Sequence, residues 1–246
     1  MLVCNNCRTE FEGNFCPNCG QRSNSGRIVF RESVRDVLEH YFDFDAPLIR
    51  TVKGLITNPG KLIREYIAGR RKSYSHPFRY FIFVLAIYLI LKSFLDFDPI
   101  QMVSDLRGIE QVPSPDTTIA KASNYFSNHI NAFLLIFALT IALFSKLFNF
   151  RSKVYFVEYL TLGFFVIGEY MLFSIFILIA STISAKFFLL NYLVVFLYPV
   201  YVLVSFHSGN LFLRILKSLL ISVLAWTSYS FLGFTISIFI VKIFGL

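Results

Sequence analysis

Long apolar stretches, which begin near residue 78, constrain the fold of this chain more than any other feature of its sequence. Each stretch is close to the roughly 20 apolar residues that an α-helix needs to cross the hydrocarbon core of a bilayer. Backbone groups inside a bilayer must find hydrogen-bond partners within the protein, which favours helices. The sequence therefore predicts an all-α integral membrane protein with about five transmembrane helices, at residues 78–95, 130–149, 154–183, 187–206 and 218–244.

The composition agrees with a membrane protein. Hydrophobic residues make up 56% of the chain and charged residues only 15%, whereas roughly 25% of residues are charged in soluble domains. The net charge of +8 comes largely from the first 80 residues and from short loops, which favours membrane lipids as a partner. We expect no nucleic-acid partner, because the first 22 residues balance Arg8 and Arg22 against Glu10 and Glu12.

The distribution of Lys and Arg predicts the orientation in the membrane. Residues 60–79 contain six basic side chains and one acid, and short basic segments also lie between spans two and three and between spans four and five. The loop of residues 96–128 instead contains five acids and two bases. Because cytoplasmic loops are rich in Lys and Arg, we expect a cytoplasmic N-terminus and an extracytoplasmic C-terminus. The first residues lack the pattern of a cleaved signal peptide.

Four cysteines near the N-terminus form two Cys-x-x-Cys pairs, Cys4 with Cys7 and Cys16 with Cys19. In a reducing compartment this spacing favours a metal site over disulfides. Four thiolates suit a closed tetrahedral zinc site that folds a small module and does no chemistry. A redox dithiol pair and a rubredoxin-type iron centre remain as alternatives. We define residues 1–26 as a zinc-ribbon-like module with its linker.

Residues 27–77 are expected to form basic amphipathic helices at the membrane interface. One helix is predicted over residues 30–42, a second is expected to end at Asn58, and a third is expected to run from Lys61 to His76. An ordinary soluble helical domain is the alternative. The basic side chains expected to contact lipid headgroups are Lys61, Arg64, Arg70, Arg71, Lys72 and Arg79.

Polar residues inside the spans are candidates for permeation, because ionisable groups in a membrane are costly. Glu158 and Glu169 share a face of the third span, about 16 Å apart along the helix, which is too far for an acid-base pair. Glu169 is expected either to serve a proton-coupled or cation-conducting site, or to make a structural hydrogen bond or an ion pair with a lysine of a neighbouring helix. Glu158 is expected to pair with Lys153 at the interface. Tyr198-Pro199 is expected to kink the fourth span.

Several motifs carry a resemblance to a known family: the segment CPNCGQR near the N-terminus, Asn58-Pro59-Gly60, Arg64-Glu65-Tyr66, Gly69-Arg70-Arg71 and Tyr74-x-x-Pro77. With these motifs and the pattern of spans, the chain resembles a bacterial family of multi-pass membrane proteins with an N-terminal zinc knuckle, described only as a domain of unknown function. The resemblance covers nearly the whole chain and implies the same architecture in the bacterial inner membrane. It implies no established activity. A His commonly follows the family's equivalent of Glu158, but Tyr159 stands here, which weakens any His-dependent chemistry.

The sequence contains no nucleophile elbow, no H-E-x-x-H motif and no phosphate-binding glycine loop, so we expect a non-enzymatic protein. Three functions stay open. The first is a membrane adaptor or regulator whose zinc module binds a cytoplasmic protein or senses a state. The second is a homo-oligomeric channel, or a membrane-permeabilising effector of a stress or antiphage system, gated by that module. The third is a lipid-processing enzyme that would use Glu158, Glu169, His207 and Arg214.

Overall fold

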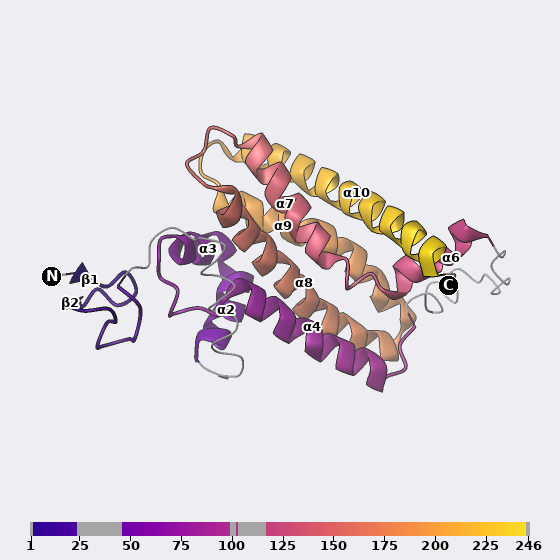
Figure 1. The fold of residues 1–246 in the computed structure, drawn as a ribbon, viewed down its shortest axis with the longest axis horizontal. Helices are drawn as coiled ribbons and strands as arrows, with labels where there is room; N and C mark the ends of the chain where they lie inside the picture. Colours follow the sequence, from indigo (N-terminus) through magenta and orange to yellow (C-terminus); the bar gives the residue numbers. More distant parts are fainter. Residues whose placement is uncertain (1, 24–45, 99–101, 103–116, 245–246) are drawn as a thin grey trace.

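The computed structural model of this chain describes residues 2–23, 46–98, 102 and 117–244, and it is mostly helical (Figure 1). A small head of residues 2–23 contains strands β1 (Leu2–Val3) and β2 (Glu10–Phe11), which pair antiparallel. The predicted helix over residues 30–42 and most of the acidic loop lie outside the described residues. The helices are α2 (Ala46–Thr57), α3 (Pro59–Ile67), α4 (Pro77–Phe94), α6 (Thr118–Asn128), α7 (Leu134–Phe148), α8 (Phe156–Ile183), the 3-10 helix η1 (Ala185–Leu189), α9 (Leu190–Phe206) and α10 (Leu211–Phe244).

Within the described residues, four helical segments are long and apolar enough to cross a membrane. They are α4, α8, the continuous η1–α9 segment and α10, and they agree with four of the five predicted spans. α9 continues through the buried Pro199 and ends only at Phe206. The prediction of a helical protein with membrane-spanning segments is therefore supported by length and composition.

The span predicted over residues 130–149 is shorter in the structure. α7 has 15 residues, or about 22 Å of helix, which is less than the roughly 30 Å of a hydrocarbon core. A turn at residues 129–133 separates it from α6. Both helices lie along α10, because Phe126 of α6 reaches Gly233 and Thr140 of α7 donates a hydrogen bond to the Ala225 carbonyl. The fifth apolar element is thus a broken pair of helices, which hydropathy does not distinguish from one span.

α8 is the central helix of the bundle formed by α4 and α7–α10 (Figure 1). It packs against α4, α7 and α9, and 67% of its most apolar window is buried, against 22–28% for α4, η1–α9 and α10. Apolar helices that keep most of their surface uncovered suit a lipid environment. The core therefore lies around α8, and the other helices form its shell.

The two ends of the bundle differ. The α7–α8 and α9–α10 connections meet at one end, where the side chains of Asn149 and His207 approach to 3.5 Å. α2 and α3 pack at this end against α8 and α9, and the head lies beyond them, whereas α10 finishes near α6 at the opposite end (Figure 1). The head and the end of α10 are therefore separated by the length of the bundle.

The third interfacial helix ends earlier than the sequence predicted. α3 stops at Ile67 instead of His76, because Gly69 adopts a φ of +102° that glycine tolerates best. The Gly69 N–H bonds to the Tyr66 carbonyl and the Arg70 N–H to the Glu65 carbonyl, the pair of bonds that defines a Schellman ending. Residues 68–76 then form a turn that leads into α4. We call α2, α3 and this turn, residues 46–76, the platform.

Candidate metal centre and the platform beneath it

The four cysteines of the head come together. The Sγ atoms of Cys4 and Cys19 lie 3.5 Å apart, as do those of Cys7 and Cys16. All four Sγ atoms lie within 4.8 Å of one another. Four sulfurs bound to zinc at about 2.3 Å would be separated by about 3.8 Å in a tetrahedron. The prediction of a four-cysteine cluster is confirmed, and its donor set could hold a metal ion.

Two similar backbone turns build the cluster. The Arg8 N–H donates to the Cys4 carbonyl and the Gly20 N–H to the Cys16 carbonyl, at 2.9 and 2.8 Å. The residue that follows the second cysteine of each pair is left-handed, with φ of +67° at Arg8 and +68° at Gly20. Glycine suits this conformation, whereas an L side chain is strained in it. The first knuckle is therefore built with a residue that costs stability, and the second is not.

The thiols of the cluster differ in acidity. Hydrogen bonding with the Thr9 side chain and backbone lowers the pKa of Cys7 to about 6. Burial raises the pKa of Cys19 to about 12. Metal ligands must be thiolates, so a bound cation would have to displace the proton from Cys19.

Hydrogen bonds attach the head to the platform turn. The Gln21 side chain, only 5% exposed, donates through Nε2 to the Gly69 carbonyl at 2.7 Å and accepts from the Lys72 N–H at 3.3 Å. Ser73 Oγ donates to Asn6 Oδ1 at 2.5 Å. Gln21 is also bonded to the second knuckle, since its carbonyl accepts from the Cys16 N–H. One residue thus joins the cysteine cluster directly to the platform.

A partly exposed network of hydrogen bonds shapes the platform turn. Glu65 Oε2 accepts hydrogen bonds from Tyr74 Oη at 2.6 Å and from Arg70 Nη1 at 3.0 Å. The Tyr74 hydroxyl is the main cause that lowers the pKa of Glu65, and Arg70 adds to it. Burial and the Glu65 carboxylate raise the pKa of Tyr74 to about 12. The motif residues Glu65, Arg70 and Tyr74 therefore bind one another and fold the surface on which the head lies.

The platform is joined in turn to the end of α9. Asn58 caps α3 by accepting from the Lys61 N–H. A Cβ on Gly60 would lie 2.0 Å from the Ser205 carbonyl oxygen, so only glycine allows this approach. Arg64 Nη1 donates to the carbonyls of Ser205 and Phe206, both at 2.7 Å. These carbonyls belong to the last turn of α9 and have no partner within the helix.

Further bonds complete this junction. Arg214 Nη1 donates to the carbonyls of Val204 and His207 at 2.9 Å. The hydroxyls of Tyr198 and Tyr201 donate to carbonyls in the last turns of α2. Burial, with Lys217 and Arg214 nearby, lowers the pKa of His207 to about 4. A continuous set of hydrogen bonds thus runs from the head through the platform to α9.

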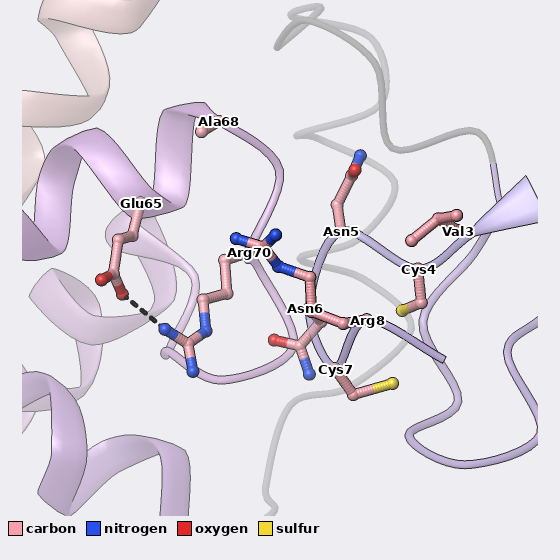
Figure 2. A pocket seen from close by; sticks show the side chains of 9 residues that line it. All are labelled: Val3, Cys4, Asn5, Asn6, Cys7, Arg8, Glu65, Ala68 and Arg70. Atoms are coloured by element: carbon pink, nitrogen blue, oxygen red, sulfur yellow. Dashed lines mark hydrogen bonds and ion pairs between the residues drawn. The ribbon is translucent and has the colours of Figure 1, made fainter. Parts of the chain in front are cut away.

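A cleft of about 550 Å³ lies between the head and α3, and Figure 2 shows the side chains that line it. On the head side it is lined by the first knuckle and β1, and on the platform side by the end of α3 and the start of the turn. The ion pair of Glu65 and Arg70 lies along one wall. The lining residues are Val3, Cys4, Asn5, Asn6, Cys7, Arg8, Glu65, Ala68 and Arg70.

The six predicted headgroup residues have mixed surroundings. Arg64 caps α9 and Arg70 pairs with Glu65, so both hold the protein together. Lys61 and Lys72 are exposed, and Lys72 lies beside Gly20 of the head. Arg71 and Arg79 are half-buried near His76, whose pKa is lowered to about 4 by its burial and then by these two charges. Contact with lipid remains a prediction for this set.

The two predicted glutamates have different environments. Glu158 accepts from the Tyr155 N–H at 2.8 Å and completes a capping box at the start of α8. Its predicted pairing with Lys153 stays a prediction. Glu169 accepts from the Tyr80 hydroxyl at 2.5 Å, so its partner is a tyrosine of α4. The structure does not bring Glu158 and Glu169 together.

Sequence reasoning missed Gln21, Tyr80 and Ser205. Gln21 follows the second knuckle directly, and that position next to a folded metal module was the one available signal. Tyr80 is one of many aromatic residues in an apolar span, and Ser205 acts through its backbone as well as its hydroxyl, which accepts from the Gly60 N–H. Such contacts depend on tertiary packing, which periodicity does not report.

Comparison with known proteins gives one match. A family model described as Protein of unknown function (DUF3667) matches residues 45–89. The matched region contains the platform and most of α4, and it includes the Asn58-Pro59-Gly60 turn and the Glu65 network, but neither the cysteines nor α8. No curated protein and no solved structure matches the chain. The chain is therefore similar to this family in the segment that joins the head to the bundle.

Proposed function

We propose that this protein is a non-enzymatic adaptor or regulator of the bacterial inner membrane, with its head in the cytoplasm and its C-terminus outside. The observation that carries the proposal is the hydrogen-bonded path from the cysteine cluster through Gln21 and Arg64 to α9. A head that only tethered a partner would need no such path. We infer that the state of the head is passed to the bundle through the platform.

We propose zinc as the metal of the head. Four thiols within 4.8 Å of one another offer a complete tetrahedral ligand set, which leaves no open position for a substrate. The head is also too small to fold by burial alone, so a metal ion would supply much of its folding free energy. Elemental analysis of the purified protein tests this proposal, and we expect one zinc ion per chain. A coloured protein that contains iron would contradict it.

The proposed partner is a cytoplasmic protein that binds at the cleft between the head and α3. The cleft is polar and combines both signs of charge, with Arg8, Arg70 and Glu65 among its lining residues, which suits a specific polar contact. Membrane lipids would contact the exposed bases of the platform beneath it. Because the Glu65–Arg70 pair forms part of the wall, an occupant would act on the platform directly.

Site-specific photo-cross-linking in living cells tests the adaptor. A photoreactive residue at Val3, which lines the cleft and is exposed, is compared with one at Asn18, an exposed head residue that does not line it. We expect an adduct with one cytoplasmic protein at position 3, lost in the Cys16→Ser background. No adduct at position 3, equal adducts at both positions, or an adduct that survives Cys16→Ser would contradict the adaptor.

A second candidate, the channel or permeabilising effector, rests on the fully buried carboxyl group of Glu169. Because protein encloses this group completely, a conduit through it would require rearrangement or assembly of several copies. Ion flux from liposomes separates the candidates. Leakage by the wild-type protein that is abolished by Glu169→Gln would favour the conduit, whereas tight liposomes with wild type and with Cys16→Ser would favour the adaptor.

A further inference from the structure

Glu169 is an acidic side chain sealed inside the bundle. It lies thirteen residues after the start of α8 and fourteen before its end, and none of its surface is exposed. Helices α4 and α9 pack against α8 around it. An ionisable group at such a position needs a physical explanation, because charge is costly in an apolar interior.

The surroundings of Glu169 offer little compensation for a negative charge. Tyr80 of α4 donates a hydrogen bond to Oε2 at 2.5 Å. The other oxygen, Oε1, is buried and has no hydrogen-bond partner among the described residues. Among the described residues, Tyr198 of α9 also lies near Glu169, but its hydroxyl donates to the Leu55 carbonyl. In the described part of the chain, no Lys, Arg or His forms an ion pair with Glu169.

The lysine partners that a charged Glu169 would need are engaged elsewhere or distant in the fold. Lys146 donates to the carbonyls of Ser152 and Val154, at the head end of the bundle. Lys186 follows the opposite end of α8, in η1, and Lys217 of α10 lies near His207, at the head end. If Glu169 were ionised, one carboxylate oxygen would accept a hydrogen bond from a neutral donor and the other would accept none. Its negative charge would be buried without compensation, which is far less stable than the neutral acid.

We propose that Glu169 is a proton-binding site, in which the carboxyl group holds a proton at neutral pH and, with Tyr80, joins α4 to α8. The ligand is a proton. Its loss would place an unpaired negative charge between the two helices and draw water or a cation into the bundle. The inference goes beyond the proposed function and does not rest on it, since a proton could occupy this site in an adaptor or in a conduit.

The packing around Tyr80 supports a fixed role for the pair. A Cβ on Gly168, the neighbour of Glu169, would lie 2.7 Å from the Tyr80 ring. The ring therefore packs closely against the backbone of α8, beside the carboxyl group to which its hydroxyl donates. Because α4 begins directly after the platform turn, a change in the charge of Glu169 would act on the helix that follows the platform.

Infrared spectroscopy of the whole protein in lipid nanodiscs tests the proposal. The carbonyl stretch of a protonated carboxylic acid is separate from the bands of carboxylates and of the backbone. Glu169→Gln preserves the size of the side chain and removes the acid. Glu158→Gln is the matched control, since Glu158 lies on the same helix and is also buried, but accepts a backbone N–H at a helix N-terminus, where a carboxylate is stabilised.

We expect the wild-type protein to show the protonated-acid band at neutral pH, well above the pH at which exposed carboxyl groups ionise. The band should be lost in Glu169→Gln and kept in Glu158→Gln, and it should shift in Tyr80→Phe, which removes the hydrogen bond but not the acid. A spectrum without the band at neutral pH, or a band that Glu169→Gln leaves in place, would overturn the proposal. An unshifted band in Tyr80→Phe would overturn the role of Tyr80.

Discussion

At the scale of single residues, two equivalent positions of the head differ in the free energy that their backbone conformation costs. Arg8 and Gly20 occupy the same place in the two knuckles and have nearly the same left-handed φ. A non-glycine residue in this conformation costs roughly 1–2 kcal/mol. The cysteine spacing predicted the cluster, but only the backbone dihedral angles reveal this asymmetry.

Arg8→Gly should therefore stabilise the metal-bound head, and Gly20→Ala should destabilise it. A gain of about 1 kcal/mol corresponds to a roughly fivefold higher chelator concentration for half-release of the metal. The measurement is a chelator competition on the purified protein, in which the two variants should shift the midpoint in opposite directions from wild type. Equal midpoints for wild type and both variants would contradict the strain at Arg8.

At the scale of elements, the platform gains its geometry from contacts between helices rather than from its own sequence pattern. At Gly60, the backbone of α3 lies in direct contact with the backbone of α9. Gly54 of α2 also has a close neighbour, but there the neighbour is the end of the flexible Leu62 side chain. The same substitution should therefore have different effects at the two glycines.

Gly60→Ala should destabilise the protein by more than about 2 kcal/mol, because no side-chain movement relieves the overlap with Ser205. Gly54→Ala should stay within about 1 kcal/mol of wild type, since a helical alanine offsets a shift of Leu62. Thermal unfolding in detergent measures both, with an expected fall in Tm of several degrees for Gly60→Ala alone. Similar Tm values for the two variants would argue against the close contact of α3 with α9.

The sequence predicted elements better than it predicted their junctions. Long apolar runs predicted α4, α8, α9 and α10 because burial in lipid requires length and hydropathy, which are local properties. The break at residues 129–133 and the end of α3 at Gly69 were not predicted. The break at residues 129–133 depends on packing against α10, which the local sequence does not reveal. The end of α3 does have a local signal, since a glycine follows its last turn. Likewise, cysteine spacing predicted the cysteine cluster, but the role of Gln21 became visible only through its contact with Gly69.

At the scale of the whole molecule, the two ends of the helical bundle carry different parts of the chain. The head, the platform and the two short connections lie at one end of the bundle, and the end of α10 lies at the other (Figure 1). Arg151 of the α7–α8 connection and Arg214, near the start of α10, are on the head side. By the positive-inside tendency this end is expected to be cytoplasmic.

Cysteine labelling tests this orientation. In a background without the four native cysteines, we introduce Thr117→Cys near α6 or Ser208→Cys in the α9–α10 connection, both exposed positions. An impermeant thiol reagent applied to cells with an intact inner membrane should label position 117 and not position 208. The reverse pattern would invert the proposed topology.

Hydrogen exchange with and without the metal tests whether a metal-folded head is coupled to the bundle through the platform turn. Gln21 holds the Lys72 N–H only while the second knuckle is folded. We expect removal of the metal, or Cys16→Ser, to raise exchange in residues 69–75 by about tenfold and to leave residues 168–178 of α8 unchanged. Unchanged exchange in residues 69–75 after the metal is lost would show that the head and the helical bundle are independent, and would contradict the proposed coupling.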